Sequence, residues 1–274
     1  MGLRINQNIA AQNAYRNLSV TDGQMSKSLE KLSSGFRINR AADDAAGLAI
    51  SEGLRSQIGG LKVAVRNAQD GISVVQTAEG ALTETHAILQ RMRDLAVQSA
   101  NDGAQNTSSQ ANADTEYQEL AKELDDIANK TTFNGTKLLD GSYTAKDFQV
   151  GAQASEVLTV SIGDMTAATI TGGVGDLTSK ANATTAITAI DTAIAAVSTE
   201  RATLGASQNR LEHKINNLSV NVENLSASES RIRDTDMAQE MMQFTRNQIL
   251  SQAGTAMLGQ ANQAPQSVLQ LLRG

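Results

Sequence analysis

The chain has 274 residues, of which 40% are apolar but only 3% aromatic, with one proline, no tryptophan and no cysteine. Compact enzyme cores draw on large aromatic rings, so this composition favours long, thin helical packing, and it excludes disulfides. The net charge is −6, and residues 101–200 hold five lysines, no arginine and fourteen acidic residues. An acidic middle between nearly neutral ends indicates ends that pack together and a solvated middle. No basic patch with interleaved aromatic residues appears, which argues against nucleic-acid binding.

The first predicted element is an amphipathic helix from Ile5 to Leu32. The segment Ser33-Ser34-Gly35 ends it, since glycine is favoured just after a helix. The first residues lack the apolar core of a secretory signal, and no run reaches the roughly 18 apolar residues of a membrane span. We therefore expect neither a Sec signal nor a membrane segment.

A polar joint follows, in which Asp43 or Asp44 is expected to cap the next helix. That helix is predicted to continue to about Ser99 and carries the clearest pattern of the chain, a seam with 4-3-4-3 spacing. The seam residues are Leu54, Ile58, Leu61, Val65, Ala68, Ile72, Val75, Glu79, Leu82, His86 and Leu89. A heptad pattern sustained over about five repeats predicts a coiled coil. Its two polar members, Glu79 and His86, are expected to fix the register or to lie at the seam edge.

The middle of the chain changes character. A third helix is predicted from about Asp114 to Lys130, followed by a turn at 132–135. Alternating apolar and polar residues with glycine breaks predict β-hairpins between Leu138 and Ile170. The Gly- and Thr-rich segment from Thr169 to Thr185 is expected to be an exposed loop.

Helix is predicted again from about Ala186 to Arg233, with a second seam, and from Asp236 to Leu272. The second seam consists of Leu204, Leu211, Ile215, Leu218, Val222, Leu225 and Ile232. The fold class is therefore mainly α: a long antiparallel coiled-coil helical bundle from both chain ends, with a small β-hairpin region at about 138–185. The terminal helices cannot cover all their apolar residues by pairing with each other, which favours self-association.

Several long segments resemble those of one family in order and at both ends of the chain. They are INQNIAAQNA (5–14), LEKLSSGFRINRAADDAAGLAISEGLRSQIGGL (29–61), NAQDGISVVQTAEGALTETHAILQRMRDLAVQSAND (67–102), FNGTKLLDG (133–141), ENLSASESRIRDTDMAQEM (223–241) and SQAGTAMLGQANQAPQSVLQLL (251–272). Together they cover well over half of the chain. The sequence resembles bacterial flagellin, the subunit of the flagellar filament.

The resemblance implies a minimal flagellin with two domains. Residues 1–42 plus 236–274 would form the terminal coiled coil called D0, and residues 43–235 the domain D1. Subunits of this family polymerise into an extracellular helical filament for swimming, after export through the flagellar type III apparatus. The implied partners are other copies of the chain, an export chaperone on the C-terminal helix, and the filament cap and hook-junction proteins.

The residues expected to carry subunit assembly are the apolar residues of the two terminal helices. They are Ile5, Ile9, Leu18, Met25, Leu29, Leu32, Met241, Phe244, Ile249, Met257, Val268, Leu269, Leu271 and Leu272. The resemblance also implies contact with the vertebrate Toll-like flagellin receptor. The motif LQRMRDLAVQ assigns Arg91 and Leu95 to that contact, and spacing from Phe133 assigns Glu116; their native role would be subunit packing.

No set of residues points to catalysis, a cofactor or a metal. His86 and His213 both lie on predicted coiled-coil helices, and no HExxH motif or cysteine accompanies them. Asp43-Asp44 is better explained as a helix cap than as an acid–base pair. We therefore expect no enzyme.

Two alternatives to a filament flagellin remain. A hook–filament junction protein would share the terminal helices, but would be less apt to keep LQRMRDLAVQSAN and SQAGTAMLGQANQ so fully. A monomeric secreted coiled-coil binding protein would leave the terminal apolar stripes unexplained.

Overall fold

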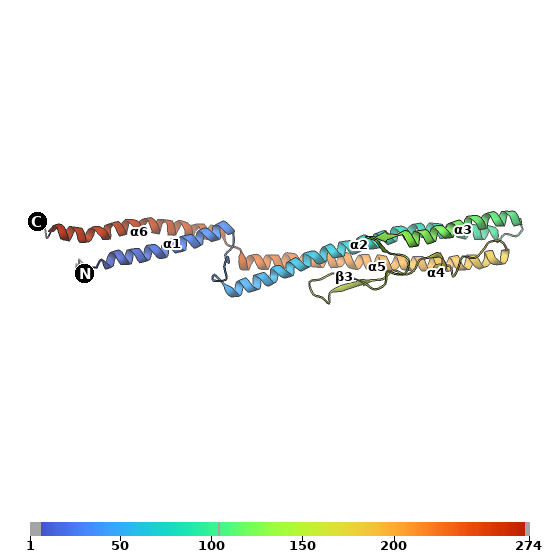
Figure 1. Cartoon of the computed structure of the whole chain (residues 1–274), viewed down its shortest axis with the longest axis horizontal. Helices are drawn as coiled ribbons and strands as arrows, with labels where there is room; N and C mark the ends of the chain where they lie inside the picture. The colour runs from blue at the N-terminus through green and yellow to red at the C-terminus, as the bar shows by residue number, and fades with distance from the viewer. Residues whose placement is uncertain (1–6, 104, 272–274) are drawn as a thin grey trace. The chain divides into compact units, whose positions relative to one another are not determined.

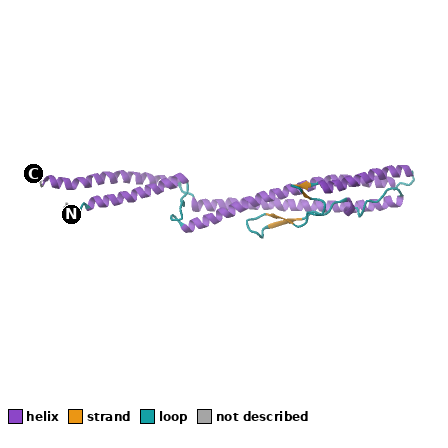
Figure 2. Cartoon of the chain, viewed as in Figure 1, coloured by secondary structure: helices purple, strands orange, loops and turns teal. Residues whose placement is uncertain are grey.

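The computed structural model describes residues 7–103 and 105–271, with side chains described as far as residue 263. Most of these residues are helical (Figures 1 and 2). The helices are α1 (Ile9–Ser34), α2 (Ala45–Ser99), α3 (Thr107–Lys130), α4 (Ala167–Ile170), α5 (Lys180–Arg233) and α6 (Met237–Leu271). The strands are β1 (Thr132–Phe133), β2 (Thr136–Lys137), β3 (Lys146–Gln149) and β4 (Val157–Val160). The predicted fold class, mainly α with a small β-hairpin region, is confirmed.

The chain forms two compact units, each built from segments described here separately. One unit consists of residues 57–223, and the other of residues 1–56 together with 224–274. Within the unit 57–223, the long helices α2 and α5 run alongside α3 (Figure 1).

The core of the unit 57–223 follows the predicted seams. Six members of the first seam are buried in the structure: Ile58, Leu61, Ala68, Val75, Leu82 and Leu89. On α5, Leu204, Leu211 and Leu218 are buried as well. Helix α3 adds Tyr117 and Leu124 to the larger cluster, which holds Val75, Leu82, Leu89 and Leu204, while Ala68 and Leu211 belong to a smaller one. Apolar residues buried between long helices are what a heptad repeat predicts. The polar seam residue Glu79 pairs at the core's edge with Arg201 of α5, 3.7 Å away.

Two small antiparallel hairpins lie in this unit. β1 and β2 are joined by Asn134-Gly135, whose φ angles of 48° and 77° are those of a tight hairpin turn. In the second hairpin, Phe148 of β3 lies opposite Leu158 of β4. This hairpin approaches α2 so closely at Gly71 that an added Cβ would lie 3.2 Å from the Phe148 ring. Glycine at 71 thus allows the hairpin to pack on the helix.

The segment predicted to be an exposed loop, 169–185, is partly packed, and this expectation is wrong. Ile170, Thr171 and Leu177 are all buried, and Leu177 has no exposed surface. The backbone N–H of Leu177 donates to Asp114 Oδ1 over 2.8 Å, which fixes the segment against α3. Helix α5 then begins at Lys180, six residues before the predicted start.

Helix α3 also begins earlier than predicted, at Thr107 instead of Asp114. The side chain of Asn106 accepts a hydrogen bond from the N–H of Ser109 over 2.7 Å and so caps the first turn. The polar, Ser- and Asn-rich turns between these two positions carry no apolar repeat, and the buried Gln110 also holds them, since its Nε2 donates to the Ser99 carbonyl over 3.1 Å.

The joint between α1 and α2 belongs to the unit formed by 1–56 and 224–274. Helix α1 ends as predicted, with Gly35 in the left-handed region at φ 76°. The predicted cap of α2 is Asp44, whose Oδ1 accepts from the Gly47 N–H over 2.8 Å. The other candidate, Asp43, accepts instead from the N–H groups of Arg40 and Asn39, which lower its pKa.

Candidate functional site

Helices α1 and α6 lie side by side and antiparallel in the unit that holds both chain ends (Figure 1). The contacts that hold them together are largely polar. Asn8 Nδ2 donates to the Ala261 carbonyl over 2.7 Å, and the Ser251 hydroxyl donates to Asp22 Oδ1 over 2.9 Å. Near the other end of the pair, Lys31 Nζ lies 3.8 Å from Glu240 Oε2. These contacts fix the register of the two helices.

The fully buried residues of this pair are also polar. Ser28 is 4% exposed, Glu240 7% and Asn247 8%. Small and polar residues therefore occupy the closest approach of the helices, and an apolar knob is seen where Leu18 packs 3.3 Å from the Cβ position of Gly254. Polar groups at the centre of a helix pair specify register, but they contribute little apolar stabilisation.

Many large apolar residues of the same pair are exposed. Among the described side chains of the whole chain, sixteen large apolar residues are exposed, and ten of these lie on α1 and α6. They are Ile9, Tyr15, Val20, Leu29, Met237, Met241, Met242, Ile249, Leu250 and Met257. We call these ten residues the terminal apolar surface. An exposed apolar surface of this extent is typical of a protein–protein contact.

The predicted assembly residues divide into three groups in the structure. Five are exposed and belong to the terminal apolar surface: Ile9, Leu29, Met241, Ile249 and Met257. Four are half-buried: Leu18, Met25, Leu32 and Phe244. Five lie outside the described residues or side chains: Ile5, Val268, Leu269, Leu271 and Leu272.

Sequence reasoning omitted five members of the surface. They are Tyr15, Val20, Met237, Met242 and Leu250. The signal that could have found two of them is the i, i+4 row on α6, because Met242 and Leu250 are separated by two such steps across Arg246. Tyr15 and Val20 follow no row of this kind and become evident only from their exposure.

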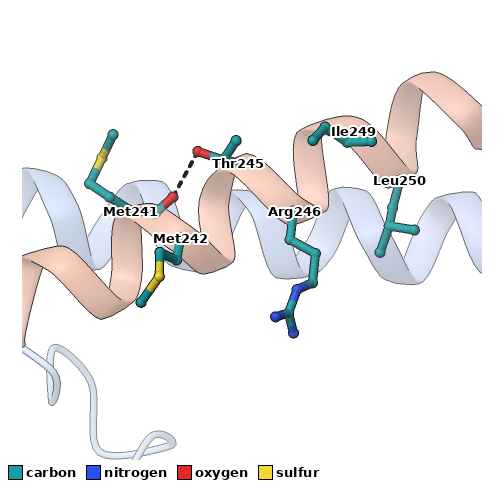
Figure 3. Close-up of a pocket in the computed structure, with 6 residues that line it drawn as sticks. All are labelled: Met241, Met242, Thr245, Arg246, Ile249 and Leu250. Carbon is teal, nitrogen blue, oxygen red and sulfur yellow. Dashed lines mark hydrogen bonds between the residues drawn. The ribbon is translucent and has the colours of Figure 1, made fainter.

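The α6 part of the surface forms a shallow groove lined by Met241, Met242, Thr245, Arg246, Ile249 and Leu250. Figure 3 shows two rows of side chains, in which Met241, Thr245 and Ile249 point to one side of the helix and Met242, Arg246 and Leu250 to the other. The only charge in this groove is the Arg246 guanidinium. The groove is thus an apolar surface with one charged side chain, Arg246, and its lining residues form no arrangement of catalytic groups.

The joint of the same unit is held by charged contacts. The Arg233 guanidinium lies 4.8 Å from the centre of the Phe36 ring, and its Nη1 donates to Glu52 Oε1 over 2.6 Å. That bond lowers the pKa of the Glu52 carboxyl. The backbone completes the contact, since the Arg37 N–H donates to the Arg233 carbonyl over 2.7 Å. These contacts join the end of α5 to the joint and the start of α2.

The predicted receptor residues lie in the other unit, 57–223. Arg91 Nη2 and Glu116 Oε1 are 2.6 Å apart, and both side chains are about half exposed. Leu95 is only 3% exposed and belongs to the core between α2 and α3. The structure therefore brings Arg91 and Glu116 together at the surface and sets Leu95 beneath it.

Metal and membrane sites were not expected from the sequence. Within residues 7–103 and 105–271, no three His, Asp or Glu side chains gather in a way that could hold a metal ion. Over the same residues, no helix is both long and apolar enough to cross a membrane. His86 lies on α2 with Nε2 3.0 Å from Gln90 Nε2.

Comparison with known proteins places this architecture in a family. The description "Bacterial flagellin N-terminal helical region" matches residues 5–144, and "Bacterial flagellin C-terminal helical region" matches residues 187–272. A protein called Flagellin from Halalkalibacterium halodurans is 55% identical over 271 residues, 98% of this chain and 99% of that protein. The Flagellin of Bacillus subtilis is 52% identical over 99% of this chain and 100% of that protein.

A solved structure agrees with the sequence matches. The crystal structure of Bacillus cereus flagellin is 38% identical and has a TM-score of 0.50, over 60% of this chain and 94% of that one. The family descriptions and the two relatives span nearly the whole chain, including both terminal helices. This chain belongs to the bacterial flagellin family.

Proposed function

We propose that this chain is the structural subunit of a bacterial flagellar filament and that it polymerises through the terminal apolar surface of α1 and α6. The observation that carries the proposal is the reversed burial in this helix pair, where Ser28, Glu240 and Asn247 are inside and ten large apolar side chains are outside. Fully burying one Leu, Ile or Met side chain contributes about 1.5–3 kcal/mol. Contacts with further copies of the chain would supply that stabilisation.

A helical filament needs contacts between unlike surfaces that repeat without closing into a ring. The terminal apolar surface meets this requirement because it extends along two different helices, and a neighbouring copy can offer α6 residues to α1 residues. We assign residues 1–42 plus 236–274 to D0, the part that carries this surface, and residues 43–235 to D1.

The remaining partners follow from membership of the family. The chain would be exported through the flagellar type III apparatus and would act outside the cell, in the filament. Before export, a chaperone would cover the α6 groove around Met241, Met242 and Ile249, which is apolar and open. The filament cap and the hook-junction proteins would contact the same terminal surfaces at the two ends of the polymer.

Two other functions fit less well. A hook–filament junction protein shares terminal helices of this kind, but the relatives at 55% and 52% identity are both named flagellin and match from end to end. A monomeric secreted coiled-coil protein would have no use for ten outward-facing apolar residues on two helices. We propose no enzymatic activity, no cofactor and no nucleic-acid or membrane partner.

The proposal is tested by seeded polymerisation of the purified chain, followed by negative-stain microscopy, beside a chain that ends at residue 235. The full chain should form filaments and the shortened chain should not. Circular dichroism of the shortened chain is the control, since the unit 57–223 has its own core and should stay helical. Filaments from both chains would place assembly elsewhere, and filaments from neither would favour the junction or monomer function.

We also propose that Arg91, Leu95 and Glu116 contribute to recognition by the vertebrate Toll-like flagellin receptor. Arg91 would make the contact directly, because its guanidinium is about half exposed and is oriented by Glu116 at 2.6 Å. Leu95 would act by packing beneath Arg91, given its 3% exposure. Buried arginines near the centre of an interface are frequent binding hot spots.

Receptor activation by Arg91→Ala subunits tests this second proposal. The affinity of the Arg91→Ala subunit for the receptor should fall by roughly thirtyfold, corresponding to about 2 kcal/mol for a hot-spot arginine. Arg93→Ala is the matched control, because Arg93 lies on the same helix and pairs with Asp191 at 2.6 Å. Equal losses for the two variants would contradict the assignment of Arg91.

A further inference from the structure

The chain contains eight methionines, and those of α6 differ sharply from those of the core. Met237, Met241, Met242 and Met257 are exposed by 47%, 49%, 66% and 66%. We propose that these four methionines are an oxidation site through which peroxide-class oxidants block polymerisation of the unassembled subunit. The inference rests on the proposed function, because it takes the terminal apolar surface as the assembly surface.

The core methionines provide an internal comparison. Met92 has no exposed surface, and Met165 is 6% exposed in the unit 57–223. Oxidation of a thioether requires that the oxidant reach the sulfur, so susceptibility follows exposure. Met25 of α1 is half-buried and should react at an intermediate rate. Among the methionines that the structure describes, the exposed ones therefore share one helix, α6.

The chemistry is a two-electron oxygen transfer. The Met sulfur attacks one oxygen of hydrogen peroxide, a sulfur–oxygen bond forms and the oxygen–oxygen bond breaks. The departing hydroxide takes up the proton of the transferred oxygen and leaves as water. The sulfur is oxidised to the sulfoxide, the peroxide is reduced, and no further reactant is required; methionine sulfoxide reductases reverse the change.

The position of the methionines gives this oxidation a consequence for assembly. Met241 and Met242 belong to the two rows of the α6 groove, which also hold Ile249 and Leu250 (Figure 3). A sulfoxide is polar and chiral, and burying a polar group without a hydrogen-bond donor is unfavourable. Arg246 is the one charged donor in the groove, and it lies in the row of Met242. Several sulfoxides in one apolar contact would therefore weaken the contact between subunits.

Oxidation should affect free subunits and not assembled filaments. In a free subunit all four sulfurs are accessible, while in a filament built on this surface they would be covered by the neighbouring copy. Peroxide should therefore block the entry of new subunits and leave formed filaments intact. The subunit is therefore sensitive to peroxide between its synthesis and its assembly into the filament.

The experiment treats the full-length monomer and, separately, assembled filaments with hydrogen peroxide. Peptide mass spectrometry then measures sulfoxide at each methionine, and light scattering measures seeded polymerisation. In the monomer, the four α6 methionines should oxidise at least about tenfold faster than Met92 and Met165. Polymerisation should fall at least tenfold and return after treatment with methionine sulfoxide reductase.

Two variants make the result specific to the proposed site. The quadruple variant M237L/M241L/M242L/M257L conserves side-chain volume and should polymerise equally well before and after peroxide. The double variant M241Q/M242Q places polar side chains in the groove and should polymerise poorly without any peroxide. The double variant and the reductase arm remain decisive if the quadruple variant does not assemble.

Three results would overturn the inference: normal polymerisation of fully oxidised wild-type chain, an unchanged loss in the quadruple leucine variant, or normal polymerisation of M241Q/M242Q. The second result would assign the loss to residues other than these four. Failure of untreated wild-type chain to polymerise would instead contradict the proposed function itself.

Discussion

The two units of this chain differ in where they place their large apolar side chains. In the unit 57–223, Leu82, Leu89, Ile190 and Leu204 are fully buried, and the apolar seams of α2 and α5 are used inside the subunit. In the α1–α6 pair the buried residues are polar, ten large apolar residues are exposed, and Leu18, Met25, Leu32 and Phe244 are only half-buried. The first unit is complete as a monomer, while the second gains most of its apolar stabilisation only when further chains cover it. Residues 57–223 therefore serve the folding of the subunit, and the terminal helices serve its assembly.

The largest effect is expected for a truncation in the core of the unit 57–223. Leu89→Ala should lower the free energy of unfolding of the monomer by about 2–5 kcal/mol, because it leaves a cavity among fully buried side chains. Urea denaturation followed by circular dichroism measures this value. Ile249→Ala, at a 60% exposed position of α6, is the contrasting variant and should change it by less than about 0.5 kcal/mol. Similar losses for both would remove the difference between the units.

The same Ile249→Ala variant, which should hardly change the stability of the monomer, should have a large effect on polymerisation. We expect the concentration of subunits left unpolymerised at equilibrium to rise about tenfold, since part of an Ile side chain is no longer buried between copies. Sedimentation of filaments and assay of the supernatant gives this concentration. Val157→Ala, at a 42% exposed position of β4, serves as the control and should leave it unchanged. A larger rise for Val157→Ala than for Ile249→Ala would move the assembly surface into the other unit.

A smaller effect is expected from the polar centre of the α1–α6 pair. Lys31→Met should destabilise the pairing by about 1 kcal/mol, because the Glu240 side chain is 9% exposed and loses its partner. Amide hydrogen exchange in residues 237–247 measures the change. Lys122→Met is the control, since Lys122 and Glu119 are both exposed on α3 and such pairs contribute little. Unchanged exchange in Lys31→Met would show that the polar contacts do not hold the pair.

The smallest effect concerns the joint and depends on pH. The bond from Arg233 lowers the pKa of Glu52, so the ionised carboxylate stabilises the folded joint above the ordinary glutamate pKa of about 4.3. This stabilisation is lost as the pH falls through the lowered pKa. Glu52→Gln should therefore reduce the Tm slightly at pH 7, and its difference from wild type should narrow in acid. A difference that widens as the pH falls would contradict the role of this pair.

Much of the fold could be predicted because its strongest signals are local. The seam from Leu54 to Leu89 repeats a heptad without interruption, and Gly35 and Asp44 mark helix ends by well-known capping chemistry. The packing of the segment 169–185 was not predicted, because its many Gly and Thr residues indicate a loop and outweigh the three large apolar residues Ile170, Val174 and Leu177. The burial of Leu177 depends on Asp114 of α3, far away in sequence.

A self-association surface on the terminal helices could be predicted from the sequence, but only some of its residues could. Apolar residues on the terminal helices indicated self-association, yet periodicity does not distinguish the side that faces the partner helix from the side that faces other subunits. Leu18 and Leu29 both fit the apolar pattern of α1, and only the structure shows that Leu18 packs against α6 while Leu29 is 56% exposed. Lys31 and Glu240, 3.8 Å apart, also lie on the side that faces the partner helix.

The most direct test of the account is a cryo-electron microscopy structure of the filament at side-chain resolution. The measurement is the area that each residue loses when neighbouring subunits are added to one copy. The account predicts that Ile9, Leu29, Met241, Ile249 and Met257 lose most of their exposed area, and that most subunit contacts lie within residues 1–42 and 236–274. A filament in which these side chains remain in contact with solvent, with its main contacts in residues 57–223, would contradict it.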